Sequence, residues 1–262
     1  MDLRVAAETD KGVVRPDNED ALLVSLPLVA VADGVGGHNA GEVASGLAVD
    51  VLSEWKRKIA KRGGRRLRNA ALDANQRIYT RAQQDATLLG MATTLTAAWI
   101  DAGTCTIAQV GDSRAYLLRD GNLQQLTEDQ SVVAALVREG RITAEEAYQH
   151  PWRNRVLQAL GHQEEVVVQM LSVELQIDDR ILLASDGLTD VLSSATIQAV
   201  LRLNTPGEML CRWLVRLAKA AGSTDNITVA LVDVVANGAG KRNPAGRFVR
   251  RVASRFRRKY RR

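Results

Sequence analysis

The sequence predicts an α+β fold built on mostly antiparallel sheets, because strand-like segments follow one another in runs and helix-like segments form separate runs. Two tight-turn signals, D-A-G at 101–103 and R-D-G at 119–121, separate strand-like segments and predict hairpins. A third hairpin is expected where Pro27 interrupts the apolar run at 21–33. A doubly wound parallel sheet would instead need strands that alternate regularly with helices.

The first part of the chain begins with strands and then changes to helices. Residues 3–8, 21–25 and 28–32 are short, apolar and rich in Val and Leu, as expected of strands. Over residues 41–59 the apolar side chains recur at helical spacing and charged side chains fill the opposite face. A basic, glycine-containing break then leads into a second predicted helix at about 66–85.

The second part of the chain returns to strands before ending in a helical layer and one last strand. The polar stretch 128–160 is predicted to be helical, although it contains Pro151. The remaining predicted strands are 91–100, 104–110, 114–119, 165–175, 180–185 and 226–235, and the remaining helices are about 194–203 and 206–221.

The composition is that of a soluble globular protein, with 46% apolar and 25% charged residues. No apolar run approaches the roughly 20 residues of a membrane-spanning helix, and the amino terminus lacks the apolar core of a signal peptide. We therefore expect a cytoplasmic protein. Cys105 and Cys211 have no metal-ligand spacing and lie in apolar segments, so we expect two reduced core thiols.

The net charge of +5 comes from the carboxy-terminal segment 237–262, which holds eleven of the 35 basic residues and none of the 30 acidic ones. The rest of the chain therefore has a formal charge of −6, which argues against nucleic acid as the main substrate. Within the segment, four apolar residues recur at every fourth position: Phe248, Val252, Phe256 and Tyr260. As a helix the segment could dock on an anionic membrane, an acidic protein or nucleic acid; otherwise it is a disordered, solubilising tail.

Four short acidic stretches, each beside a predicted strand, are the most informative feature. They are G-V-V-R-P-D-N-E-D (12–20), V-A-D-G-V-G-G-H (31–38), A-S-D-G-L-T-D (184–190) and S-T-D-N-I-T (223–228). Each alone is more typical of a turn or a solvated corner than of a site. Together they can supply carboxylate oxygens from rigid strand ends to one place, and such oxygens are the ligands that Mg²⁺ and Mn²⁺ prefer.

In the order and type of these motifs the chain resembles the metal-dependent protein phosphatases, the protein phosphatase 2C-like family, and specifically its compact bacterial branch. The resemblance covers about residues 3–235. It extends to M-A-T-T-L-T-A-A (91–98), V-G-D-S-R-A-Y (110–116), L-T-E-D-Q-S (126–131) and H-P-W-R-N-R-V-L-Q-A-L-G (150–161). It implies a four-layer α-β-β-α sandwich at 1–236, with a flap beside the active site at about 127–155 and the basic tail at 237–262.

The resemblance also implies a ligand set for two Mg²⁺ or Mn²⁺ ions. Asp33 would bridge the two ions, and the Gly34 carbonyl would complete the shell of one of them. Asp186 and Asp225 would hold the other ion. A water shared by the two ions would lose a proton near neutral pH, and the hydroxide would attack phosphorus in line.

Three further carboxylates have supporting roles in this picture. Glu19 and Asp20 would lie at the rim of the cluster and act through bound water. Asp112 would join Asp186 at a third, weaker metal site. The alternative for Asp112 is a hairpin-turn carboxylate that faces solvent.

Arg15 would bind the substrate phosphate, since its planar guanidinium pairs with two oxygens at once. The alternative is a surface ion pair with a neighbour such as Asp17. Val35 stands where many eukaryotic members have a histidine as candidate general acid, so another group or a bound water must protonate the leaving group. Ala92 and Gln130 also depart from the usual Gly and His. We expect structural or loop roles for the three histidines, His38, His150 and His162.

The resemblance implies hydrolysis of phosphoserine and phosphothreonine on proteins by a monomer, in opposition to a cytoplasmic Ser/Thr kinase. The flap would be a mobile lid that contacts the substrate protein, or else a solvated helical pair. One rival interpretation is a catalytically silent relative that binds phosphoproteins, although Asp33, Asp186 and Asp225 are all present. A second rival is a hydrolase of small phosphorylated metabolites.

Overall fold

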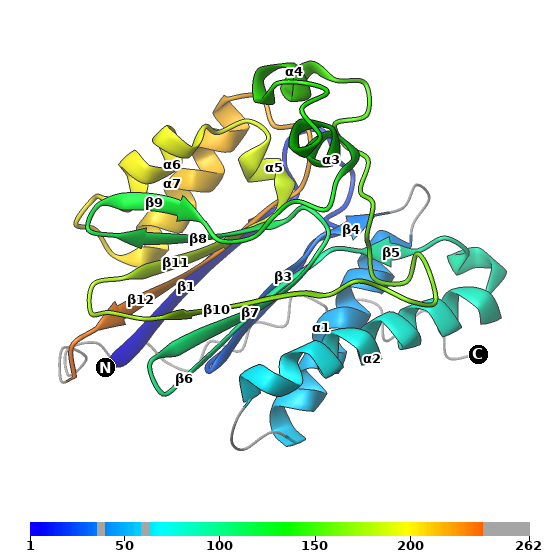
Figure 1. Ribbon diagram of the computed structural model, residues 1–262, viewed down its shortest axis with the longest axis horizontal. Coiled ribbons are helices and arrows are strands. Elements are labelled where there is room, and N and C mark those ends of the chain that lie inside the picture. The colour runs from blue at the N-terminus through cyan, green and yellow to red at the C-terminus, as the bar shows by residue number, and fades with distance from the viewer. Residues whose placement is uncertain (36–39, 59–62, 238–262) are drawn as a thin grey trace.

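The computed structural model describes residues 1–35, 40–58 and 63–237 (Figure 1). The strands are β1 (Asp2–Asp10), β2 (Ala21–Ser25), β3 (Leu28–Ala32), β4 (Gly34–Val35), β5 (Ala92–Thr93), β6 (Leu95–Asp101), β7 (Thr104–Val110), β8 (Arg114–Arg119), β9 (Asn122–Gln125), β10 (Gln169–Glu174), β11 (Arg180–Ala184) and β12 (Ile227–Val235). The helices are α1 (Gly41–Lys58), α2 (Gly63–Gln84), α3 (Val132–Arg138), α4 (Ala144–Gln149), α5 (Asp186–Thr189), α6 (Ser194–Leu201) and α7 (Gly207–Ala220), with a short 3₁₀ turn at Ala86–Leu88.

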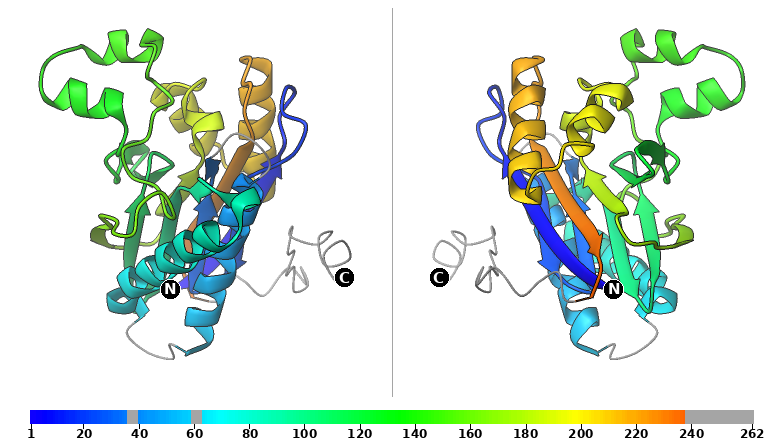
Figure 2. Two further views of the ribbon diagram at one scale, coloured as in Figure 1. Left: turned by 90° about the vertical axis from the view of Figure 1, so that its right-hand side faces the viewer. Right: turned by 90° about the vertical axis from the view of Figure 1, so that its left-hand side faces the viewer.

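Two five-stranded sheets form the centre of the molecule, in the orders β1-β12-β11-β8-β9 and β10-β7-β6-β3-β2. Every strand pairing within them is antiparallel. Helices α6 and α7 cover the outer face of the first sheet, and α1 and α2 cover the second (Figures 1 and 2). The predicted α+β class with mostly antiparallel sheets is confirmed.

Side-chain alternation in the strands explains the four layers. In β3, Val29 and Val31 point into the apolar layer between the two sheets, where they join residues of the first sheet such as Ile181. Leu28 and Ala30 point the other way, into the layer beneath α1 and α2. A third apolar cluster lies between the first sheet and α6–α7. A strand that is buried on both faces reads as a continuous apolar run, as this one does.

The two hairpins predicted from the D-A-G and R-D-G signals are both present, and their geometry follows from their turn residues. In the β6–β7 turn Ala102 has φ 49° and Gly103 has φ 82°, and in the β8–β9 turn Asp120 has φ 50° and Gly121 has φ 75°. Two consecutive residues with positive φ form the turn whose twist matches antiparallel strands, and Gly and Asp tolerate that conformation best.

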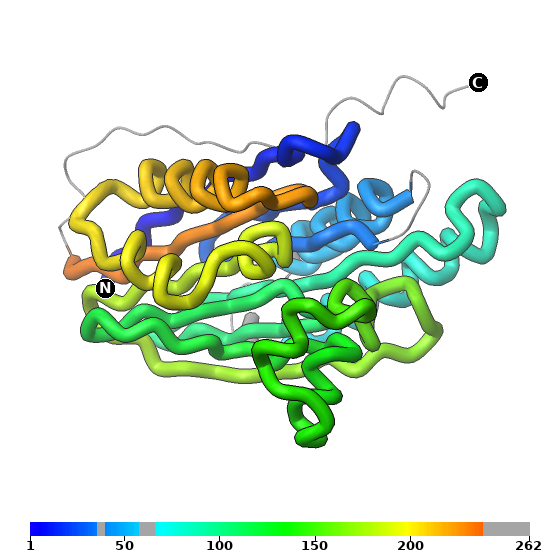
Figure 3. The backbone as a smooth tube through the Cα atoms, turned by 90° about the horizontal axis from the view of Figure 1, so that it is seen from above, coloured from blue at the N-terminus to red at the C-terminus, as the bar shows by residue number. Residues whose placement is uncertain are grey.

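The stretch 128–160 is less helical than predicted, because only α3 and α4 form within it and the chain after Gln149 runs through turns. The two helices project from the sandwich at one end (Figure 3). Strand β10 begins at Gln169 rather than 165, and the strand predicted at 91–100 is divided into β5 and β6. The short elements β4, β9 and α5 were not predicted. Cys105 and Cys211 are buried free thiols, as expected.

The basic segment beyond Asn237 and His38 both lie outside the described residues, so the predictions made for them stay predictions. Within the described residues, no helix combines the length and the apolar character that crossing a bilayer requires.

One buried ion pair offers a test of how the first sheet is stabilised. The Asp179 side chain is 1% exposed, and Arg119 donates to both of its oxygens at 2.9 and 2.6 Å. Arg119→Ala would leave a buried, unpaired charge, so we expect the free energy of unfolding to fall by about 2 to 4 kcal/mol in equilibrium urea denaturation. The matched control is Arg138→Ala, which breaks an exposed pair with Glu128 and should cost about 0.5 kcal/mol or less. Equal losses of unfolding free energy in the two variants would contradict a special stabilising role for the buried Arg119–Asp179 pair.

Candidate metal centre

The strand register brings the acidic motifs to one end of the sandwich. In the second sheet Ala21 at the start of β2 pairs with Ala32 at the end of β3. In the first sheet Ala184 at the end of β11 pairs with Arg114 at the start of β8, and Ile227 at the start of β12 pairs with the last residue of β1. The predicted site carboxylates lie one or two residues beyond these paired ends: Asp20, Asp33, Asp112, Asp186 and Asp225.

The backbone of Asp33 is held by hydrogen bonds to Thr93 and Thr94. Its N–H donates to Thr94 Oγ1 at 3.0 Å, and its carbonyl accepts from Thr94 N at 2.8 Å and from Thr93 Oγ1 at 2.8 Å. The next residue, Gly34, lies so close to other backbone that an added Cβ would come within 2.5 Å of the Gly41 carbonyl carbon and 2.7 Å of the Glu19 oxygen. Only glycine fits there, and Asp33 therefore has a fixed backbone position.

Asp20 links the two sheets. Its carboxyl group is buried, and Oδ2 accepts a hydrogen bond from Ser185 Oγ at 3.0 Å. Ser185 Oγ in turn accepts from the N–H of Thr228 at 2.9 Å. The start of β2 is thereby joined to the end of β11 and to β12, which places Asp20 beside Asp186.

Asn226 positions the loop that carries Arg15 and Glu19. Its amide nitrogen donates to the carbonyls of Lys11 and Asp17, both at 2.9 Å, and its Oδ1 accepts from Glu19 N at 2.8 Å. The neighbouring Asp225 accepts an ion-paired hydrogen bond from Arg15 Nη2 at 2.6 Å. The partner of Arg15 in the structure is therefore Asp225, on the other side of the site, and not the adjacent Asp17.

The gathered carboxylates raise one another's pKa values. Burial, followed by the charges of Asp186 and Asp20, raises the pKa of Asp33 well above its ordinary value. Burial raises the pKa of Asp20 to about 6, and burial together with the charge of Asp225 raises the pKa of Asp186 to about 6. Burial, and then the charge of Glu42, also raises the pKa of Glu19. Desolvation and like charge both penalise the ionised forms, so this end of the molecule favours protons or added cations.

Asp112 belongs to the same cluster. It is half-buried rather than directed at bulk solvent, and burial followed by the charge of Asp186 raises its pKa well above the ordinary value. Asp190, a residue that the sequence reasoning did not single out, lies beside it. Asp190 is exposed as a whole residue, but desolvation of its carboxyl group and then the charge of Asp186 raise its pKa to about 7. Asp190 follows Asp186 by four residues, about one helical turn, and this spacing could have identified it from the sequence.

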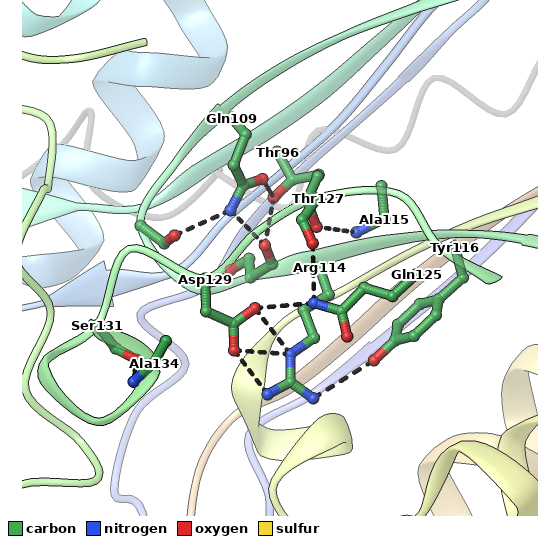
Figure 4. A network of polar contacts seen from close by, with 12 residues as sticks. Thr96, Gln109, Arg114, Ala115, Tyr116, Gln125, Thr127, Asp129, Ser131 and Ala134 are labelled. Atoms are coloured by element: carbon green, nitrogen blue, oxygen red, sulfur yellow. Dashed lines mark hydrogen bonds and ion pairs between the residues drawn. The ribbon is translucent and has the colours of Figure 1, made fainter. Parts of the chain in front are cut away.

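The flap is attached to the cluster through one bidentate ion pair (Figure 4). Arg114, two residues after Asp112, donates from Nε at 3.0 Å and from Nη2 at 2.6 Å to the carboxylate of Asp129. Gln125 and Tyr116 complete the network around the pair. On the neighbouring residue Gln130, the side chain accepts from Gly111 N at 2.8 Å, which gives the unusual Gln a structural role. The beginning of the flap is therefore fixed beside Asp112.

The residues fit divalent cations in their chemistry, although their side chains are not already arranged as a cage. Among the described residues, no group of three or more His, Cys, Asp and Glu side chains forms a ready-made metal site. Two buried carboxylate oxygens, Asp20 Oδ1 and Asp186 Oδ1, have no hydrogen-bond partner within the described part of the chain. Unsatisfied, buried carboxylate oxygens beside like charges are the donors that a hard cation stabilises.

The structure also shows where the residues that depart from the family pattern, and the histidines, lie. Val35, in β4, pairs with Ala92 of β5 and has no proton to donate. His150 caps the end of α4 and accepts from Trp152 N at 3.1 Å through Nδ1, and His162 follows the Gly161 turn. These two histidines have the loop positions expected. The roles of Asn226 and Ser185 were missed, because hydrogen bonds to distant backbone leave no local sequence signal.

Comparison with known proteins agrees with this geometry. Residues 17–218 match the family model described as protein phosphatase 2C. The serine/threonine protein phosphatase PstP of Mycobacterium tuberculosis is 43% identical over 248 residues, which are 92% of this chain and 47% of PstP. The chain thus spans about half the length of that relative. The serine/threonine phosphatase stp of Listeria monocytogenes is 40% identical over 235 residues, which are 86% of this chain and 93% of stp.

Solved structures show the same fold. The crystal structure of M. tuberculosis PstP has a TM-score of 0.84 and 40% sequence identity, covering 89% of this chain and 99% of that one. A structure of the PstP catalytic domain in complex with two manganese ions has a TM-score of 0.83, at the same identity and coverage. The family model, the relatives and the arrangement of the acidic motifs agree, and the chain belongs to the protein phosphatase 2C family.

Proposed function

We propose that this chain is a protein phosphatase that uses Mn²⁺ or Mg²⁺ to hydrolyse phosphoserine and phosphothreonine on proteins. The observation that carries the proposal is the convergence of buried and half-buried carboxylates from both sheets at one end of the sandwich, beside an exposed arginine. Family membership, the names of PstP and stp, and the two manganese ions of one PstP structure support it.

The carboxylates divide into two groups by position. Asp33, with the Gly34 carbonyl, is proposed to serve two cations at once, and hydrogen bonds from Thr93 and Thr94 to its carbonyl hold its backbone in place. Asp186 and Asp225 are proposed to hold one of these cations. When bound, the cations would supply positive charge to the phosphoryl oxygens and an activated water, the hydroxide nucleophile inferred from the sequence.

The remaining acids are proposed to support these positions. Asp20 is held by Ser185 and Glu19 by Asn226, so both can orient water at the rim of the cluster. Asp112 is proposed to join Asp186 at a third, weaker cation. Asp190 lies near both, because after burial the charge of Asp186 raises the pKa of Asp190 and the charge of Asp190 contributes to raising that of Asp112.

Arg15 is the proposed phosphate ligand. Its side chain is 47% exposed and lies on a loop that Asn226 anchors, so the guanidinium can reach a phosphate without movement of the backbone. A planar guanidinium binds two phosphoryl oxygens and stabilises the charge that they carry during transfer. Val35 cannot protonate the leaving oxygen, so that proton is proposed to come from water.

The flap is the proposed contact for the protein part of the substrate. Its helices project beyond the sandwich, and Tyr148 and Trp152 are 61% and 47% exposed there. The biological role that follows is to oppose a cytoplasmic Ser/Thr kinase as a monomer. The basic segment 237–262 is proposed to dock on an anionic membrane or an acidic protein.

The substrate class is tested with the full chain and Mn²⁺ on two panels, one of phosphoserine and phosphothreonine peptides and one of nucleotides. We expect kcat/KM to be about tenfold or more higher for the peptides, because the flap contacts are available only to a polypeptide. A preference for nucleotides would replace the proposal with hydrolysis of small metabolites.

The metal chemistry is tested on the same peptides by Asp33→Asn, which keeps the shape of the side chain and removes its charge. We expect hydrolysis to fall by about 10³-fold or more, with the circular dichroism spectrum unchanged. The matched control is Asp101→Asn, in the exposed β6–β7 turn, which should retain activity. Near-normal turnover of the Asp33 variant would contradict the assignment.

The raised pKa values predict that cation binding displaces protons. Because Asp20 and Asp186 have a pKa of about 6 instead of 3.8, each still holds part of its proton near pH 6. Cations bind the ionised forms, so Mn²⁺ affinity should rise as the pH rises through about 6. Titration calorimetry between about pH 5 and pH 7 should show this rise in affinity, and buffers of different ionisation enthalpy should reveal proton release at about pH 6. An affinity that stays constant between about pH 5 and pH 7 would exclude these carboxylates as ligands.

A further inference from the structure

The Arg15–Asp225 ion pair joins two groups that the proposed function assigns to different ligands. Arg15 Nη2 lies 2.6 Å from Asp225 Oδ2. The other carboxylate oxygen, Oδ1, accepts from the backbone N–H of Asn226 at 2.8 Å. Each oxygen therefore already accepts from one donor, and a cation at Oδ2 would have to lie beside the positively charged guanidinium, which like-charge repulsion disfavours.

Arg15 is held in this position by charge rather than by packing. The hydrogen bond to Asp225 is the main reason that the pKa of Arg15 is raised, and the charges of Glu19 and Asp33 act in the same direction. The side chain is 47% exposed and the Asp225 side chain 30% exposed, so solvent reaches the pair and the guanidinium can rotate away into it.

The backbone on either side of the pair does not need to move when the pair opens. Asn226 holds the loop at Lys11 and Asp17, and an added Cβ at Gly12 would lie 2.2 Å from the Asp225 carbonyl oxygen. The loop and the start of β12 are thus packed against each other. Opening the ion pair is a side-chain rotation between two fixed pieces of backbone.

We propose that Arg15 exchanges between Asp225 and the substrate phosphate, and that cation binding at Asp225 controls this exchange. A cation competes with the guanidinium for Oδ2, and the released Arg15 then becomes available to a phosphate monoester. Cation binding and phosphate binding are thereby coupled through one side chain, and by linkage the phosphate also favours the cation. The inference rests on the proposed function, because it takes Asp225 as a cation ligand.

The first test measures Mn²⁺ affinity by titration calorimetry on the full chain after treatment with a chelator, with no phosphate present. Arg15→Gln should bind Mn²⁺ about 2- to 5-fold more tightly than the unmodified chain, the range expected for loss of one exposed competing ion pair. The control is Lys219→Gln, which removes a lysine of similar exposure at the same end of the sandwich, bonded to Asp10. Its affinity should stay unchanged.

Equal Mn²⁺ affinity in Arg15→Gln and the unmodified chain, or an equal gain in Lys219→Gln, would overturn the proposal. The first result would show no competition, and the second would show only a loss of general positive charge. Failure of the unmodified chain to bind Mn²⁺ at all would instead overturn the proposed function, so the two failures are distinguishable.

The second test is a double-mutant cycle on inorganic phosphate binding in the presence of chelator, followed by phosphorus NMR. Asp225→Asn frees Arg15 and should raise phosphate affinity by about 2- to 5-fold. With Arg15→Gln already present, the same Asp225 change should give a clearly smaller gain. An identical gain in both backgrounds would mean that Asp225 acts on phosphate by simple repulsion, and the exchange would be excluded.

Discussion

Mutual repulsion among closely grouped carboxylates is the constraint around which this end of the molecule is organised. Burial and then the charges of Asp186 and Asp20 raise the pKa of Asp33, so these side chains cannot all be ionised at low cost without countercharge. Burial and then the charges of Asp225 and Asp20 raise the pKa of Asp186 in the same way. Within the described residues, Arg15 supplies part of that countercharge at Asp225, and Arg114 lowers the pKa of Asp112. A site with this surplus of negative charge is suited to divalent cations.

The sandwich tolerates this surplus of negative charge because apolar packing stabilises the rest of the fold. Three apolar layers hold the two sheets and their helices together, and the carboxylates of the candidate site lie just beyond strand ends. Hydrogen bonds from Thr93 and Thr94 then fix Asp33, and Gly34 packs where no side chain could fit. Apolar packing elsewhere in the fold thus offsets the free-energy cost of grouping these carboxylates.

Much of the fold was predictable because it follows from local patterns. The continuous apolar run of β3, the helical periodicity of α1 and the D-G turn at Gly121 each have a direct physical reading. The polar stretch at 128–160 was predicted less well, since polar residues tolerate helix, turn and loop alike. Short elements such as α5 escape sequence reasoning because tertiary packing, not propensity, forms them.

The site was predictable to the level of which residues meet, but not of how they meet. The motifs indicated Asp33, Asp186 and Asp225 together, whereas the pairing of Arg15 with Asp225 joins residues 210 positions apart and has no local signal. Asn226 is a further example, since its three long-range hydrogen bonds become evident only in the folded chain.

Anomalous X-ray scattering from crystals grown with Mn²⁺ would locate the cations relative to this cluster. We expect two strong manganese peaks at the end of the sandwich, with an Asp33 oxygen shared between them and Asp186 and Asp225 on one of them. Peaks located elsewhere, or none at this cluster, would contradict this expectation.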